Sequence, residues 1–325
     1  MDGAIVVSRH GGPEVLEWGK KAPGKPGPGE VLVRQSAVGL NYIDVYHRVG
    51  LYPMTLPFSP GVEGAGVVEQ VGDGVTDLKV GDRVAYTATG VVGSYVEARV
   101  LPARLLFKIP KGIDDATAAA IMLKGGTVEY LVRRTYPVKA GEWVLLHAAA
   151  GGVGLLASQW LRAIGAKVIG TAGSEDKAEL ARTNGCAHTI LYRSEDVAKR
   201  VKEITGGRGV DVVYDSVGKD TFMGSLDSLR PRGMMVSFGN ASGPVEPIAP
   251  LLLLQKGSLF LTRPTIGHYY ADRAEAVEGV QALFDMVTSG KVKPHIGARY
   301  PLREAARAHV DLEARATVGS SVLTV

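Results

Sequence analysis

Residues 142–154 read Glu-Trp-Val-Leu-Leu-His-Ala-Ala-Ala-Gly-Gly-Val-Gly, an apolar strand that runs into a glycine turn and then a helix. This order predicts a dinucleotide cradle, because small residues let backbone N–H groups approach a pyrophosphate and a helix N-terminus attracts the anion. In the spacing G-x-G-x-x-G the first position is Ala149, so an ordinary tight turn is the alternative. The pattern of the surrounding sequence therefore decides between a dinucleotide cradle and an ordinary turn.

Strands and helices alternate after this turn. The pattern predicts helices at 155–164, at 174–183 and from 194 onward, and strands at 166–171, 188–191, 210–214, 234–238 and 258–262. Apolar strands joined by helical crossovers favour an α/β fold with a doubly wound parallel sheet, which we assign to residues 123–264.

The end of the second strand decides which dinucleotide is bound. An NAD-binding site keeps a carboxylate about 20 residues beyond the glycines, whereas this chain has Thr-Ala-Gly-Ser at 171–174. Glu175 and Asp176 follow where they favour the first turn of a helix that Ser174 can cap. Lys177 is placed to reach a 2′-phosphate, with a solvated helix face as its alternative role. The pattern favours NADPH.

The composition fits a cytoplasmic enzyme. The chain has 325 residues, 46% hydrophobic and 22% charged, with a net charge of +4. It shows no membrane span and no signal peptide, and its lone cysteine, Cys186, forms no internal disulfide. The basic residues are dispersed among acids, so charge does not indicate nucleic-acid or membrane binding.

The first 120 residues show a different sequence pattern. Runs rich in β-forming residues alternate with Gly/Pro turns, which predicts a mostly antiparallel, barrel-like domain with strands at 5–8, 31–40, 64–71, 83–87 and 94–100. Beyond residue 265 we expect a helix at 272–289 and a strand at 320–325. Residues 1–122 and 265–325 would then form one discontinuous domain, leaving a cleft against residues 123–264 for a substrate.

Several motifs resemble those of one known group. They are the runs at 10–16 (His-Gly-Gly-Pro-Glu-Val-Leu), 39–44 (Gly-Leu-Asn-Tyr-Ile-Asp), 50–53, 147–154, 213–218 and 236–240. Over essentially its whole length the chain resembles the medium-chain dehydrogenase/reductase superfamily, and within it the zinc-independent NADPH:quinone oxidoreductases similar to zeta-crystallin. The resemblance implies a Rossmann domain inserted into a GroES-like catalytic domain. It also implies a homodimer, with a tetramer as the alternative, in which the sixth strand forms an open sheet edge.

The zinc-dependent branch of this superfamily differs at the metal ligands. Its three catalytic ligand positions correspond to Asn41, Val62 and Leu123, and two of these side chains are hydrocarbon. We therefore expect no metal. Without a Lewis acid the enzyme needs an acceptor that takes hydride unaided, such as a quinone or a conjugated carbonyl.

The resemblance also implies roles for single residues. The pyrophosphate would meet Gly152 and Val153, and the 2′-phosphate would meet Ser174, Lys177, Tyr192 and Arg315. The middle of the coenzyme would pass Ser216, Phe238 and Gly239 at the strand ends. Thr127 and Tyr130 would flank the nicotinamide. Asn41, Tyr46, Tyr52 and Arg263 would line the catalytic cleft, with Asn41 also contacting the coenzyme.

Four of these regions have structural alternatives. Tyr46 and Tyr52 could anchor a short helix, and Asn41 could cap the helix predicted at 42–48. Asp44 fits a buried hydrogen-bonding role better than that of a proton donor. Arg263 could pair with a local carboxylate.

Three functions remain open at this point. The first is NADPH-dependent quinone reduction by hydride or one-electron transfer in the interdomain cleft. The second is reduction of enones or 2-alkenals. The third is a crystallin-like or RNA-binding role, which the phosphate cradle and the dispersed charge disfavour.

Overall fold

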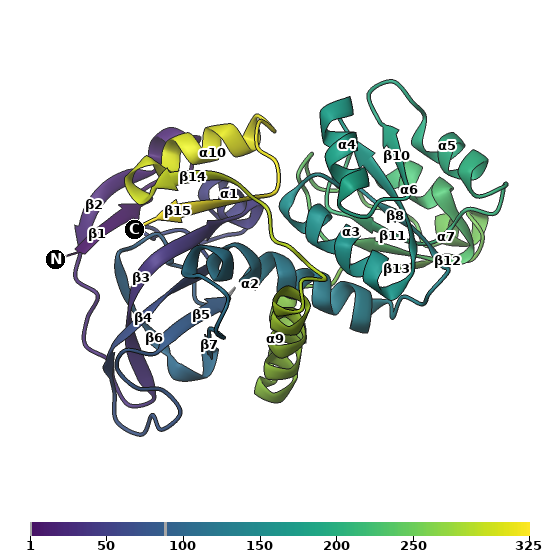
Figure 1. Ribbon diagram of the computed structural model, residues 1–325. Coiled ribbons are helices and arrows are strands. Elements are labelled where there is room, and N and C mark those ends of the chain that lie inside the picture. The colour runs from purple at the N-terminus through teal and green to yellow at the C-terminus, as the bar shows by residue number, and fades with distance from the viewer. Residues whose placement is uncertain (1, 88–89) are drawn as a thin grey trace. The chain divides into compact units, whose positions relative to one another are not determined.

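The computed structural model describes residues 2–87 and 90–325, which form two units (Figure 1). Unit 1 comprises Met1–Gly126, Tyr269–Thr288 and Pro294–Val325, and unit 2 comprises Thr127–His268 and Ser289–Lys293. The chain passes from unit 1 to unit 2 inside helix α2 (Asp115–Tyr130), where the Thr117 N–H donates to Asp114 Oδ1 over 2.6 Å near the helix start. The pattern analysis did not predict this helix, and the expected border at residue 123 falls within it.

Unit 2 is built on a six-stranded parallel sheet in the order β10-β9-β8-β11-β12-β13, the doubly wound arrangement that the sequence predicts. The strands are β8 (Trp143–Leu146), β9 (Lys167–Ala172), β10 (His188–Leu191), β11 (Val210–Asp215), β12 (Leu229–Ser237) and β13 (Phe260–Thr262). Every residue of β11 is buried, as expected for a strand covered on both faces.

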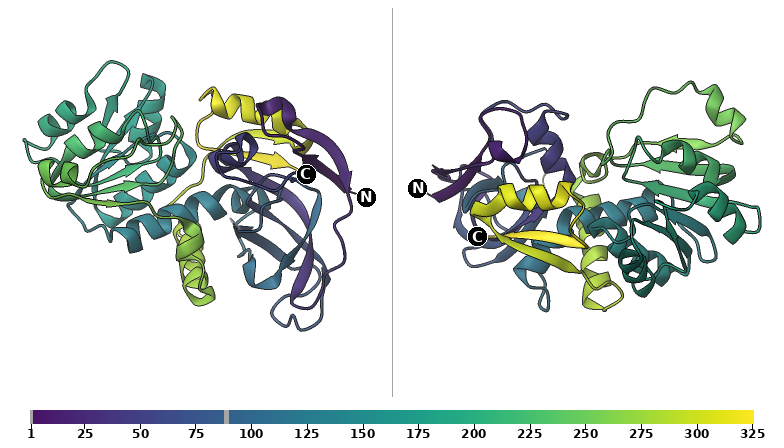
Figure 2. Two further views of the ribbon diagram at one scale, coloured as in Figure 1. Left: turned by 180° about the vertical axis from the view of Figure 1, so that it is seen from behind. Right: turned by 90° about the horizontal axis from the view of Figure 1, so that it is seen from above.

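Helices cover both faces of this sheet. They are α3 (Gly152–Ile164), α4 (Glu175–Thr183), α5 (Val197–Ile204), α6 (Phe222–Ser228) and α7 (Leu251–Gln255). Figures 1 and 2 show α3 and α4 on one face and α5 and α6 on the other, which follows from right-handed crossovers in opposite directions from β8. Leu145, Ile169 and Val213 of the sheet pack with Phe222 and Leu226 of α6 in one core.

Several predicted boundaries in unit 2 were wrong. Helix α3 begins at Gly152 and not at residue 155, and β12 begins at Leu229 and not at residue 234. The sixth strand begins at Phe260, not Ser258, because Ser258 has a left-handed φ of 56° that breaks the extended backbone. The helix expected from residue 194 begins at Val197. Its N-cap is Asp196, whose side chain accepts a hydrogen bond from the Lys199 N–H.

Unit 1 contains a seven-stranded sheet with the path β14-β15-β3-β4-β5-β7, to which β6 adds by pairing with β3. Its strands are β3 (Glu30–Leu40), β4 (Glu63–Val71), β5 (Arg83–Thr87), β6 (Ala98–Pro102), β7 (Leu106–Lys108), β14 (Ile296–Pro301) and β15 (Ser320–Thr324), and a separate hairpin pairs β1 (Asp2–Val6) with β2 (Glu17–Lys21). All these pairings are antiparallel except β14 with β15. This agrees with the β-rich GroES-like domain expected from the sequence.

Unit 1 also contains helices. They are α1 (Tyr42–Val49), the unit 1 part of α2, α9 (Arg273–Thr288) and α10 (Ala305–Glu313), while α8 (Ile266–Tyr269) spans the border between the units. Two expected strands were misplaced: 5–8 is observed at Asp2–Val6, and 94–100 at Ala98–Pro102. Among residues 2–87 and 90–325, no helix is long and apolar enough to cross a bilayer.

Candidate functional site

The turn between β8 and α3 has the geometry of a phosphate cradle. Ala148 adopts a left-handed φ of 52°, and the Gly151 N–H donates to its carbonyl oxygen over 2.9 Å. A Cβ atom on Gly154 would lie 2.4 Å from that same oxygen, so glycine is needed for this close approach. Gly151 is the N-cap and has no side chain to satisfy the first-turn N–H groups of Gly152 and Val153. These residues fit a pyrophosphate.

A buried polar network holds the cradle from within the sheet. His147 Nδ1 lies 3.1 Å from Thr171 Oγ1, and its Nε2 lies 3.0 Å from Ser225 Oγ. Ser225 donates to Asp215 Oδ2 over 2.8 Å, and Asp215 Oδ1 accepts from the Gly218 N–H over 3.0 Å. Burial lowers the pKa of His147, so its ring is neutral near pH 7. Sequence reasoning missed this network, although polar residues ending adjacent apolar strands were its signal.

The residues expected along the middle of the coenzyme lie together. Phe238 follows β12, and its N–H donates to the Asp215 carbonyl at the end of β11 over 2.8 Å. A Cβ on Gly239 would lie 2.3 Å from the Ser216 carbonyl oxygen, so these two loops touch at a glycine. Arg263 Nη1 donates to the Ser237 carbonyl over 3.0 Å.

The junction after β9 carries the residues expected at the 2′-phosphate. β9 ends in Thr171 and Ala172 with no carboxylate. Ser174 is the N-cap of α4, but its side chain makes no capping hydrogen bond. Its hydroxyl can therefore bind a ligand. Tyr192 extends its hydroxyl to within 2.8 Å of the position that a Cβ on Gly173 would occupy. Lys177 lies half-buried one turn into α4.

In unit 1, α1 and the loop after it present the aromatic residues expected to contact substrate. The rings of Tyr46 and Tyr52 meet edge to face with centroids 5.2 Å apart, and the Tyr52 N–H donates to the Tyr46 carbonyl over 3.2 Å. Asn41 is the N-cap of α1, as the alternative role predicted. Its backbone N–H is bound by Asp44 Oδ2 over 2.9 Å, while its side-chain amide contacts Glu63.

A buried ion pair lies beside the positions that match the zinc ligands of the metal-dependent branch. Glu63 follows the buried Val62, and its carboxylate accepts from Asn41 Nδ2 over 2.7 Å and from the Leu123 N–H over 2.6 Å. Lys124 Nζ lies 3.2 Å from Glu63 Oε1. A cation from the chain therefore already neutralises this carboxylate. In the described ranges, no group of three or more His, Cys, Asp and Glu side chains could hold a metal.

A second buried chain of polar groups runs from Asp44 to the last helix. Tyr95 donates to Asp44 Oδ2 over 3.0 Å, and its oxygen lies 3.0 Å from His309 Nε2. Arg48 Nη1 lies 3.0 Å from His309 Nδ1 and pairs with Glu313 over 2.7 Å. Burial raises the pKa of Asp44 to about 7 and lowers that of His309 to about 3. Asp44 thus has the buried hydrogen-bonding role that the sequence favoured.

Three further candidates lie in other elements. Thr127 and Tyr130 belong to the last turn of α2, where Thr127 is half-buried and Tyr130 is buried. Arg315 follows α10 in unit 1, is exposed and has a left-handed φ of 57°. The contacts of these residues with the coenzyme stay predictions.

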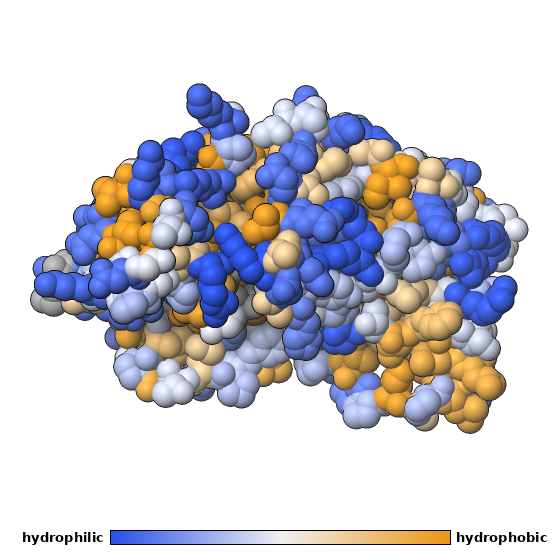
Figure 3. Space-filling model, turned by 90° about the horizontal axis from the view of Figure 1, so that it is seen from below, coloured by the Kyte–Doolittle hydropathy of each residue, from blue (hydrophilic) through white to orange (hydrophobic). Residues whose placement is uncertain are grey.

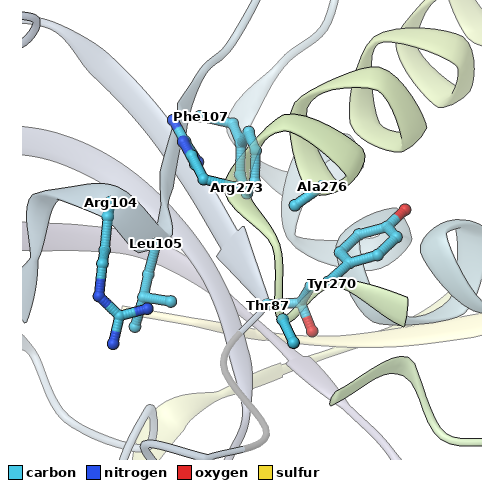
Figure 4. A pocket seen from close by; sticks show the side chains of 8 residues that line it. Thr87, Arg104, Leu105, Phe107, Tyr270, Arg273 and Ala276 are labelled. Carbon is cyan, nitrogen blue, oxygen red and sulfur yellow. The ribbon is translucent and has the colours of Figure 1, made fainter. Parts of the chain in front are cut away.

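Unit 1 also has a pocket of about 90 Å³ that contains none of the predicted site residues (Figure 4). The lining side chains come from Thr87, Arg104, Leu105, Phe107, Tyr270, Ala271, Arg273 and Ala276. The Arg273 guanidinium lies over the Phe107 ring, 4.3 Å from its centroid. Pockets for small ligands usually measure about 300–1,000 Å³, so this one is too small for a dinucleotide.

Comparison with known proteins agrees with this architecture. The family model for the alcohol dehydrogenase GroES-like domain matches residues 27–111, and the model for zinc-binding dehydrogenases matches residues 152–285. The second range excludes positions 41, 62 and 123, so the match carries no information on the zinc ligands. A GroES-like domain joined to a doubly wound nucleotide-binding sheet defines the class of medium-chain dehydrogenases and reductases.

Individual relatives narrow the class. A quinone oxidoreductase of Pseudomonas aeruginosa is 54% identical over 98% of both chains, and a 2-haloacrylate reductase of a Burkholderia species is 49% identical over 98% of both. The crystal structure of Escherichia coli quinone oxidoreductase complexed with NADPH superposes with a TM-score of 0.97 at 48% identity, covering 99% of this chain and 100% of that one. The chain belongs to the quinone oxidoreductase family within this class.

Proposed function

We propose that the protein catalyses the NADPH-dependent reduction of quinones. The observation that carries this proposal is the junction after β9, where Gly173 and Ser174 stand in place of a carboxylate and Lys177 and Tyr192 lie beside them. A carboxylate there would repel a 2′-phosphate, whereas this junction offers hydroxyl groups and a cation to it. NADPH, when bound, supplies the hydride or the single electrons.

The protein groups bind and orient the reactants. The first-turn N–H groups of Gly152 and Val153 bind the pyrophosphate, and Ser216 and Gly239 let the coenzyme pass close to the strand ends. Tyr46 and Tyr52 offer aromatic surfaces for a flat acceptor, and Asn41 offers its amide to an acceptor or to the coenzyme. Holding the reactants together in a water-poor site supplies most of the catalysis.

The donor set around Glu63 explains why a quinone suits this site. Val62 and Leu123 cannot bind a Lewis acid, and Lys124 already neutralises the Glu63 carboxylate. A quinone accepts hydride without such activation. Hydride addition gives a phenolate-like anion. The conjugate acid of this anion has a pKa of about 10, like that of a phenol, so solvent can complete the protonation.

Reduction of a conjugated carbon–carbon double bond is the second candidate function. The observation that favours it is the similarity to a 2-haloacrylate reductase at 49% identity over 98% of both chains. An enone or 2-alkenal also accepts hydride without a metal, and it would use the same aromatic surfaces.

Steady-state turnover tests these alternatives. We expect purified protein to reduce a benzoquinone faster than a 2-alkenal and to prefer NADPH over NADH. Lys177→Ala should weaken apparent NADPH binding roughly tenfold and leave NADH unchanged, because it removes one charge-assisted contact to the 2′-phosphate. Equal use of both coenzymes by the native protein would overturn the coenzyme assignment. Stoichiometric bound zinc with activity lost on chelation would overturn the mechanism.

The same proposal includes a homodimer formed through unit 2. Strand β13 ends the sheet, and Phe260 is 58% exposed on it, with Leu251 and Leu254 of α7 exposed by 60% and 65%. Figure 3 shows a broad hydrophobic area at its lower right, over the region of α7. An open strand edge beside exposed apolar side chains is typical of a two-fold interface.

The proposal also covers the cellular location of the protein and whether it binds RNA. A single buried cysteine is typical of a protein from a reducing compartment, so we place the activity in the cytoplasm. The modest charge of +4, dispersed among acids, disfavours an RNA-binding role. Binding of labelled AU-rich RNA that persists at moderate salt would reverse that assignment.

A further inference from the structure

The turn after β10 places two side chains over Gly173. The Tyr192 N–H donates to the Ala172 carbonyl over 3.2 Å, which holds this turn against the end of β9. A Cβ atom built on Gly173 would lie 2.8 Å from the Tyr192 hydroxyl and 3.5 Å from Arg193 Nε. The Arg193 side chain therefore lies against the glycine that precedes Ser174, the N-cap of α4.

The carboxylates near this turn in the sequence are already bound by other groups. Glu175 at the start of α4 pairs with Arg182. Glu195 accepts a hydrogen bond from the Leu191 N–H over 2.7 Å and forms an ion pair with Arg200, whose Nε lies 2.9 Å from Glu195 Oε2. None of these contacts involves Arg193.

The Asp196 carboxylate also has a partner, because it accepts a hydrogen bond from the Lys199 N–H over 2.9 Å and so caps α5. Within residues 2–87 and 90–325, Arg193 has no hydrogen bond or ion pair of its own, and its side chain is exposed. An arginine that pairs with none of the acids flanking it, and that lies on a glycine, has its guanidinium open to a ligand anion.

We infer that Arg193 binds the 2′-phosphate of NADPH and contributes to the choice between the two coenzymes. This inference rests on the proposed function. A guanidinium presents a planar fork of donors that matches two phosphate oxygens, whereas the Lys177 ammonium acts as a point charge. The missing side chain at Gly173 lets the Tyr192 hydroxyl and the Arg193 guanidinium both lie close to the backbone that leads into α4, so the two groups can approach one phosphate together.

Binding measurements test this role without relying on turnover. Calorimetric titrations with NADPH, NADH, adenosine 2′,5′-bisphosphate and 5′-AMP would compare the native protein with Arg193→Gln. We expect the variant to bind NADPH and the bisphosphate about tenfold more weakly and the other two ligands within about twofold, because only the first two carry the 2′-phosphate. The affinity of the native protein for the bisphosphate should also fall more steeply with salt than that of the variant.

Two further variants sharpen the result. Arg193→Lys should recover part of the lost affinity, since it keeps the charge but loses the fork. Arg104→Gln removes an exposed arginine from unit 1 and should leave all four affinities unchanged. The exposed position of Arg193 predicts that each variant keeps the native circular dichroism spectrum and unfolding midpoint.

The outcomes separate this inference from the proposed function. Native discrimination between NADPH and NADH in Arg193→Gln would overturn the role of Arg193 and leave the proposed function intact. An equal loss for all four ligands would also overturn it, because Arg193 would then act on the whole adenosine moiety. Failure of the native protein to bind NADPH at all would instead remove the proposed function.

Discussion

The side-chain amide of Asn41 donates to Glu63 Oε1 over 2.7 Å, and both side chains are buried. The Glu63 carboxylate thus orients a predicted catalytic residue while it neutralises Lys124. Asn41 and Leu123 match two of the metal-ligand positions of the zinc-dependent branch, whereas here the Asn41 amide and the Leu123 N–H both donate to Glu63.

This ion pair makes a stability prediction. Glu63→Gln leaves the Lys124 ammonium buried without a counterion, which should lower the free energy of unfolding by about 3–5 kcal/mol. The double variant Glu63→Gln/Lys124→Met should be clearly more stable than Glu63→Gln alone, because no unpaired charge remains. Urea unfolding of the three proteins measures both effects. A single variant as stable as the native protein would contradict the ion pair.

Asp44 makes a prediction about pH. Its pKa in the native state is about 7, above its ordinary value of about 4, so the native state keeps a proton that the unfolded chain releases. Its contribution to stability is fully present below about pH 4 and is lost as the pH rises through 7.

Asp44→Asn tests this dependence, because asparagine stays neutral and can still accept hydrogen bonds. Between pH 5 and 8 the unfolding temperature of the variant should fall less than that of the native protein. Asp73→Asn, which changes an exposed carboxylate, serves as the control and should follow the native curve. Parallel curves for Asp44→Asn and native protein would refute the buried, protonated aspartate.

Gly154 predicts a strong effect of one methyl group. In Gly154→Ala the Cβ would lie 2.4 Å and 2.6 Å from the carbonyl oxygens of Ala148 and Ala149, so the backbone must shift. We expect NADPH binding to be lost and stability to fall by about 1–3 kcal/mol, the usual cost of overpacking.

Gly224→Ala in α6 is the matched control for this change. A Cβ at Gly224 meets no atom within 4 Å, so alanine should stabilise the helix by about 0.5–1 kcal/mol and leave binding unchanged. Calorimetry with NADPH and thermal unfolding measure both variants. Tight NADPH binding by Gly154→Ala would show that the cradle does not need its glycine.

Phe260 tests the proposed dimer. Phe260→Lys places a charge on the exposed edge strand β13, which should shift the protein from dimer to monomer in light-scattering measurements of molar mass. Val80→Lys replaces an exposed residue of unit 1 and should leave the mass unchanged. A native protein that is monomeric at micromolar concentration would remove this interface from the proposal.

Local patterns predicted the parallel sheet well but missed helix α2. The strands of unit 2 are apolar runs ended by glycine or polar residues, and this signal lies within a few residues of each strand. In α2 the charged residues Lys124 and Glu129 are buried along with small residues. The sequence therefore shows no polar stripe that would mark an exposed helix face. The start of β13 was misplaced because the left-handed backbone of Ser258 has no signature in a serine side chain.

The sequence by itself determined the class of fold and the coenzyme that the junction after β9 favours, and it predicted the phosphate cradle. Each of these depends on residues close along the chain, where strand period, glycine position and helix start follow directly from local chemistry. Only the tertiary structure decided that Glu63 pairs with Lys124 and that Tyr95 joins Asp44 to His309. It also left Arg193 unpaired among the described residues. Such pairings join segments tens to hundreds of residues apart, and they depend on which side chains packing brings together.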